Sequence, residues 1–258
     1  MFLCEQAFLA RHGGRGVESG AVYGGAHRPA GKKGECVRKK EIQAYTAAGA
    51  LFALFVLFTV LVATVDRQAI GPEGTVVGFA AVNGYVFGHI GVHEVWYDIT
   101  RSLGYAVLAV ALSFAALGLR QALKRKSLGK VDRSLVVLGL YYLLVFACYL
   151  LFEVLVINYR PLLMDGQLEA SYPSSHTLMT LCIMAAVPGQ LRALYPQKKR
   201  LRAAAVILAV VVSLLMILGR ILSGVHWLSD MLGSLLLSSA LTALYDAVLE
   251  HVKLERRR

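Results

Sequence analysis

Six long apolar stretches limit the possible folds of this 258-residue chain more than any other feature. A helix crosses the apolar core of a membrane, about 30 Å thick, with about 20 predominantly apolar residues. The stretches of roughly this length are Ala47–Val65, Ile99–Leu119, Ser134–Ile157, Thr177–Leu194, Ala203–Leu222 and Trp227–Leu249. Hydrophobic residues make up 57% of the chain and charged residues 17%, which excludes a disordered chain or a small disulfide scaffold. The sequence therefore predicts an all-α bundle of six transmembrane helices.

The basic residues are divided unevenly between the two ends of these stretches. If the N-terminus is cytoplasmic, nearly all of the 27 lysines and arginines fall on the cytoplasmic side. The exceptions are Arg67, Arg101, Arg160 and Arg220. Cytoplasmic loops of membrane proteins are enriched in lysine and arginine. We therefore expect both termini to be cytoplasmic. The net charge of +11 then reflects membrane orientation and does not indicate a nucleic-acid partner.

Composition divides the chain into three regions. Residues 1–44 are rich in glycine and basic residues and have little hydrophobic periodicity, which predicts a disordered basic cytoplasmic tail. This tail is either a contact with anionic lipids or a dispensable leader. Residues 45–250 hold the six apolar stretches and form the predicted membrane domain. Residues 251–258 form a basic cytoplasmic C-terminus.

The cysteines and two of the histidines do not predict a metal site. The cysteines lie in the tail or within apolar stretches, and their spacing does not suit zinc: they are Cys4, Cys36, Cys148 and Cys182. His89 and His93 have the spacing of one helical face, but only Glu94 is near as a further ligand. We expect this segment to be an interfacial helix with Trp96 and Tyr97 as membrane-interface aromatics, metal binding being the alternative. No metal or cofactor is predicted.

Polar residues gather at the predicted outer ends of the last four stretches. They are Arg160, Ser174, Ser175, His176, Arg220, His226 and Asp230. Ionisable groups at such positions in a membrane bundle mark functional sites by default. Their ordinary roles would be interfacial anchors for the arginines and a helix cap for Ser175. It is their occurrence together on one side that favours a site.

These residue types suit the transfer of a phosphoryl group. Two guanidinium groups match the oxygens of a phosphate, and the free N–H groups where His176 opens a helix favour an anion. The i, i+4 spacing of His226 and Asp230 allows the carboxylate to hold one ring nitrogen while the other attacks. His176 can then protonate the leaving oxygen. Such a scheme requires no metal ion.

At these residues the chain resembles the type 2 phosphatidic acid phosphatase family, which consists of integral membrane lipid phosphatases. The signatures of that family are K-x6-R-P, P-S-G-H and S-R-x5-H-x3-D. In the same order, this chain has Glu153-x6-Arg160-Pro161, Pro173-Ser174-Ser175-His176 and Gly219-Arg220-x5-His226-x3-Asp230. The resemblance covers residues 45–250 and implies six spans with an active site at the outer face.

The resemblance also implies a role for each matching residue. His226 would be the nucleophile that forms a phosphohistidine, Asp230 would orient it, and His176 would be the general acid. The phosphate oxygens would be held by Arg160, Arg220, Ser174 and the backbone N–H of Ser175.

Three positions depart from the family pattern. Gly219 replaces a serine and Ser175 replaces a glycine, and both exchanges are between small residues. Glu153 replaces a phosphate-binding lysine, so the site loses a cation and gains an anion. We expect Glu153 to act behind the phosphate site, as an ion-pair partner of Arg160 or Arg220.

The predicted function is hydrolysis of lipid phosphates or pyrophosphates at the outer leaflet of a bacterial plasma membrane. Substrates implied by the resemblance are phosphatidic acid, phosphatidylglycerol phosphate and undecaprenyl pyrophosphate. One alternative is a lipid phosphotransferase with an acceptor other than water. The other is a non-catalytic protein that binds or transports lipid phosphates. Membrane lipids are the expected partners, and the oligomeric state is left open.

Overall fold

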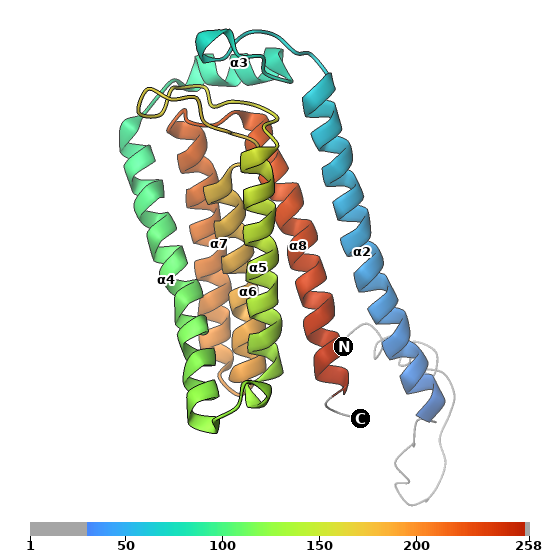
Figure 1. Cartoon of the computed structure of the whole chain (residues 1–258). Coiled ribbons are helices and arrows are strands. Elements are labelled where there is room, and N and C mark those ends of the chain that lie inside the picture. The colour runs from blue at the N-terminus through green and yellow to red at the C-terminus, as the bar shows by residue number, and fades with distance from the viewer. Residues whose placement is uncertain (1–29, 256–258) are drawn as a thin grey trace, which may run out of the picture. The chain divides into compact units, whose positions relative to one another are not determined.

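The computed structural model describes residues 30–255 (Figure 1). Of the predicted tail, residues 1–29 lie outside this range, and residues 30–44 form the start of the first helix. The long helices are α2 (Ala30–Thr64), α3 (Ala80–Ile90), α4 (Glu94–Arg125), α5 (Arg133–Val154), α6 (Ser175–Leu194), α7 (Lys199–Leu222) and α8 (Leu228–Glu255). Two short 3-10 turns, η1 (Pro72–Gly74) and η2 (Leu128–Lys130), lie in the connections.

The prediction of six membrane helices is confirmed. In the described part of the chain, six helices are long and apolar enough to cross a membrane, and they correspond to α2 and α4–α8. The second begins at Glu94 instead of Ile99, and the third ends at Val154 instead of Ile157. Pro188 lies inside α6 without ending that helix. These differences arise because apolar composition locates a span, whereas its ends depend on local hydrogen bonding.

Helix α6 is the centre of the bundle, because it packs against α4, α5, α7 and α8. Its buried face includes Leu178, Cys182 and Ala186, which lie in the main apolar core with residues of α5 and α8. The free thiols of Cys148 and Cys182 also lie within the bundle, half-buried and buried respectively. The central position of α6 places its N-terminus, which begins at Ser175, among the outer ends of its neighbours.

Aromatic contacts attach helix α2 to the rest of the domain, and two of them are with one loop residue. The ring of Tyr172, in the connection before α6, lies 6.5 Å from the ring of Phe55 and 6.4 Å from that of Phe58. The Tyr172 hydroxyl is 2.8 Å from Thr59 Oγ1. Tyr172 is fully buried by these contacts. The segment that precedes α6 is therefore fixed against α2.

A short helix, α3, forms in the segment where an interfacial helix was expected, but it does not carry both histidines. His89 lies in α3, whereas His93 precedes the first residue of α4, so the two rings do not share a helix face. Each ring bonds to a backbone carbonyl, of Tyr85 and Ile90 respectively. Within residues 30–255, no group of three or more His, Cys, Asp or Glu side chains is placed to hold a metal ion.

Helix α3 instead supports the start of α8. Asn83 Oδ1 accepts a hydrogen bond from the backbone N–H of Ser229, at 3.1 Å. Asn83 Nδ2 donates to the carbonyl of Gly78 and to Ser229 Oγ. A side-chain oxygen that accepts from a first-turn N–H satisfies a donor that has no partner within the helix. Asn83 thus caps α8 from a residue remote in sequence.

Gly78 provides the first prediction, because its α-carbon lies directly against α2. A methyl group there would overlap the carbonyl oxygen of Val62 and lie 2.7 Å from its carbonyl carbon. We expect Gly78→Ala to destabilise the protein by more than about 3 kcal/mol, since backbone must move. Gly88→Ala is the control, because nothing lies within 4 Å of that position in α3. Thermal unfolding in detergent measures both, and equal melting temperatures would contradict the packing at Gly78.

Candidate active site

The predicted site residues meet at one end of the bundle. The connection from α5 to α6 folds back on itself through a hydrogen bond from Arg160 N to Glu169 O, 3.1 Å, and another from Ser171 N to Asn158 O, 2.9 Å. The hydroxyl of Ser234 in α8 donates to the carbonyl of Ser174, 3.0 Å. These backbone contacts hold the loop over the first turns of α6 and α8.

His226 lies at the centre of this cluster, in the turn between α7 and α8. Its Nε2 atom is 3.2 Å from Nη2 of Arg220, and its Nδ1 atom is 3.1 Å from the hydroxyl oxygen of Ser171. A guanidinium only donates hydrogen bonds. Nε2 therefore accepts, and the ring proton is assigned to Nδ1. This tautomer directs the Nε2 lone pair of His226 toward Arg220.

Asp230 lies behind His226 in the first turn of α8 and is fully buried. Its Oδ2 atom accepts hydrogen bonds from the backbone N–H of Trp227, 2.8 Å, and from the hydroxyl of Ser171. The same oxygen is 3.5 Å from His226 Nδ1. Ser171 was not among the predicted site residues. It lies outside the three sequence motifs, and only the fold-back of the loop brings it to the histidine.

Burial and neighbouring cations set the charge of His226. Its side chain is almost completely enclosed, and burial lowers the pKa of the imidazole well below its ordinary value of 6.5. Repulsion by Arg160, Arg220 and His176 lowers this pKa further. His226 is consequently neutral at pH 7, the form in which a ring nitrogen has a free lone pair.

Arg220 is held in place by helix α4. Its guanidinium carbon lies 5.4 Å from the centre of the Tyr97 ring, a distance typical of a cation–π contact. Nη1 of Arg220 is 3.5 Å from Thr100 Oγ1. Trp96 and Tyr97 were expected at the membrane interface, but Tyr97 faces the arginine and Trp96 packs against α7. The first two turns of α4 are thus part of the wall of the site.

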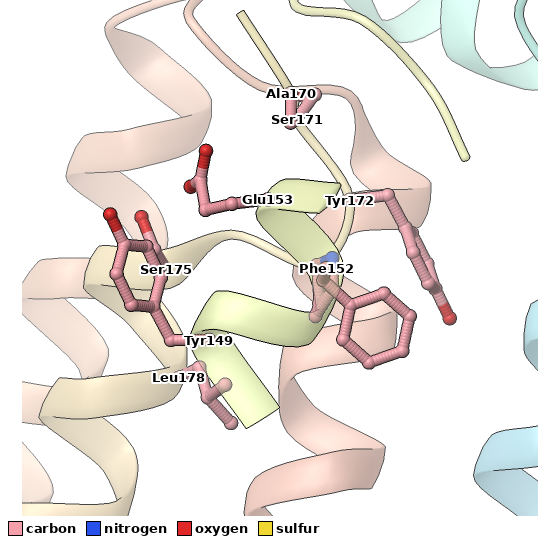
Figure 2. A pocket seen from close by; sticks show the side chains of 9 residues that line it. Tyr149, Phe152, Glu153, Ala170, Ser171, Tyr172, Ser175 and Leu178 are labelled. Carbon is pink, nitrogen blue, oxygen red and sulfur yellow. The ribbon is translucent and has the colours of Figure 1, made fainter. Parts of the chain in front are cut away.

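Arg160 and Glu153 lie on the opposite side, near the end of α5. Arg160 Nε forms an ion pair with Glu169 Oε2, 3.1 Å. Glu153 lines a small pocket with Tyr149, Ser171 and Ser175, and Figure 2 shows its carboxylate on the Ser175 side of α5. The ion pair of Arg160 in the described structure is therefore with Glu169, a residue that the sequence motifs do not include.

His176 stands at the start of α6, next to α4. A methyl group on Gly104 of α4 would lie 3.1 Å from Cδ2 of His176, so the two helices are in close contact here. Nδ1 of His176 and Nε of Arg220 are buried and have no hydrogen-bond partner among the described residues. Ser174 precedes the helix, and its hydroxyl contacts Thr177 Oγ1 at 3.1 Å. Buried polar atoms without partners are uncommon in folded proteins and call for an explanation.

Comparisons with known proteins identify the family and the fold of the chain. The sequence profile of the PAP2 superfamily matches residues 102–251. A solved structure with the same fold is a transmembrane PAP2-type phosphatidylglycerolphosphate phosphatase from Bacillus subtilis, with a TM-score of 0.56 and 17% sequence identity. The likeness covers 80% of this chain and 97% of that chain. No curated protein matches the sequence.

The Gly219 position, where the motif has serine, gives a second prediction. A side chain there would overlap Cγ2 of Thr100 and lie 3.2 Å from Cε3 of Trp96. We expect Gly219→Ser to cost about 1–3 kcal/mol of stability, because it separates α7 from α4. Thr100→Ser removes the overlapping methyl and keeps the hydroxyl near Arg220. The double variant should recover most of the lost melting temperature, and no recovery would show that Thr100 is not the obstacle.

Proposed function

The chain belongs to the PAP2 superfamily, and on this basis we propose that it hydrolyses phosphate esters or diphosphates of lipids through a phosphohistidine on His226. The observation that carries the proposal is the geometry of that ring. Nε2 of His226 faces the guanidinium of Arg220 at 3.2 Å, while Nδ1 is turned toward Ser171 and Asp230. An unprotonated ring nitrogen thus lies beside a cation suited to phosphate oxygens.

In the first step, Nε2 of His226 attacks phosphorus, and the bond from phosphorus to the leaving oxygen breaks. His176 gives its proton to that oxygen, so the alcohol or phosphate leaves in protonated form. Asp230, through its negative charge, stabilises the imidazolium character that His226 gains. In the second step water attacks phosphorus, His176 accepts a proton from it, and the nitrogen–phosphorus bond breaks to release inorganic phosphate.

The buried donors without partners support an anionic ligand at this position. His176 Nδ1 and Arg220 Nε lie at the same end of the bundle as the first N–H groups of α6. Leaving such a donor unpaired costs about 1–3 kcal/mol, and phosphate oxygens would accept from these groups. Arg160, Ser174 and the backbone N–H of Ser175 complete the proposed phosphate-binding set. Arginine cations supply the charge that a metal ion would otherwise supply, so the proposed reaction is metal-independent.

We further propose that the site faces the outside of a bacterial plasma membrane. The connection between α4 and α5, which holds Lys126 and Lys130, lies at the end of the bundle opposite the site (Figure 1). Basic loops are typical of the cytoplasmic side. Substrates in the outer leaflet would then be lipids such as phosphatidic acid, phosphatidylglycerol phosphate or undecaprenyl pyrophosphate.

Release of inorganic phosphate from these three lipids by the purified protein tests the function. We expect His226→Ala to lower the rate by more than about 1,000-fold, because the nucleophile is lost. His89→Ala is the matched control, since the ring of His89 is exposed in α3 and contacts Tyr85. Activity should persist in EDTA. Activity that EDTA abolishes and Mg²⁺ restores would contradict metal independence, and equal rates for His226→Ala and the wild type would refute the phosphohistidine.

Glu153 is proposed to stabilise Arg160 by its charge, since the two lie within electrostatic range. We expect Glu153→Gln to raise KM by up to about fivefold, the scale of a partly exposed charge pair. Glu153→Lys should raise KM further, because it repels Arg160. Glu73→Gln, at an exposed position in η1, is the control. An unchanged KM in Glu153→Gln, or a lower KM in Glu153→Lys, would contradict this role.

A further inference from the structure

We propose that Ser171 is a positioning residue that connects His226 to Asp230 through its hydroxyl group. The inference rests on the proposed function, in which His226 is the nucleophile. It differs from a direct histidine–aspartate pair, the arrangement that the sequence spacing predicts. In the structure the serine hydroxyl lies between the two side chains and contacts both.

Distances favour the indirect connection. His226 Nδ1 and Asp230 Oδ2 are 3.5 Å apart, beyond the usual 2.7–3.2 Å of a nitrogen–oxygen hydrogen bond. The hydroxyl oxygen of Ser171 lies 3.1 Å from the same Nδ1 and donates to the same Oδ2. The hydrogen-bonded connection from the ring to the carboxylate therefore passes through Ser171.

The hydrogen atoms can be placed in one consistent way. Oδ2 of Asp230 accepts from both the Ser171 hydroxyl and the backbone N–H of Trp227. The single hydroxyl hydrogen of Ser171 is used in the hydrogen bond to Asp230. Ser171 must therefore accept a hydrogen bond from His226. The proton on His226 is thereby fixed at Nδ1, and Nε2 is left unprotonated, as a nucleophile must be. The carboxylate stabilises the positive charge that develops on the ring, and the hydroxyl holds the two groups in this arrangement.

The position of Ser171 is rigid. Its side chain is 2% exposed, and its backbone N–H donates to the carbonyl of Asn158 at 2.9 Å. The next residue, Tyr172, is enclosed between α2 and α8: its hydroxyl meets Thr59, and its ring lies directly against the α-carbon of Gly233. Such anchoring on both sides keeps the hydroxyl in line with the ring and the carboxylate.

Steady-state kinetics of Ser171→Ala test the proposal. Loss of the link should lower kcat about 10- to 100-fold, the effect typical of removing a group that orients a reactive ligand. KM should stay within about twofold, because Ser171 is not among the phosphate-binding groups. Ser171→Thr, which keeps the hydroxyl, should retain more activity than Ser171→Ala. If the alanine variant does not fold, Ser171→Cys replaces it in the comparison of kcat, because a thiol is close to a hydroxyl in size but is a weak donor. Ser238→Ala, another buried serine one turn beyond Ser234, is the matched control.

A double-mutant cycle separates this role from simple packing. If the serine acts through Asp230, Ser171→Ala should cost little further activity in an Asp230→Asn background. Independent, multiplicative losses would overturn the proposal, as would an unchanged kcat in Ser171→Ala. Failure of the proposed function would give a different result: neither the wild type nor the variants would release phosphate, or His226→Ala would be as active as the wild type.

Discussion

The burial of Arg220 in the end of an apolar bundle is the interaction on which the rest of the site depends. A cation in such surroundings is unfavourable unless other groups replace its water. Here Tyr97 offers its ring, Thr100 its hydroxyl and His226 its Nε2 lone pair. Two of these partners belong to α4, which approaches closely because residue 219 is glycine. The packing of α4 on α7 and the placement of the cation are thus one structural feature.

The remaining polar groups are arranged around that cation from distant parts of the chain. Asn83 of α3 caps the helix that carries Asp230, and the loop before α6 brings Ser171 to the histidine. Each of these contacts joins residues separated by 50 or more positions. The site therefore forms only when the whole bundle has assembled. This suits a reaction in which positioning and electrostatic stabilisation provide most of the catalysis.

The sequence was sufficient to predict the spans because crossing a membrane requires a local property, a run of apolar residues. The arginine, histidine and aspartate candidates could be recognised for a similar reason, since their motifs lie within short segments. Ser171, Thr100 and Glu169 could not, because their contacts depend on loop conformation and helix packing. The expected pairing of Glu153 with an arginine depended on a local motif and also on the conformation of a loop. Arg160 or Arg220 was expected as its partner, and the folded loop places Glu169 against the guanidinium of Arg160.

The pairing of Arg160 with Glu169 bears on the loss of the lysine found in the family motif. A guanidinium carries five N–H donors in a fixed plane, and Glu169 engages the Nε edge. The two terminal nitrogens keep four donors, which suffice for a bidentate contact with phosphate. Glu169 is half-exposed whereas Arg160 is buried, so the anion orients the arginine from the solvent side. Glu153 adds a second negative charge within electrostatic range of Arg160. In the proposed function, Glu169 orients Arg160 through Nε, and the terminal nitrogens are the groups that would bind the anion without the lysine.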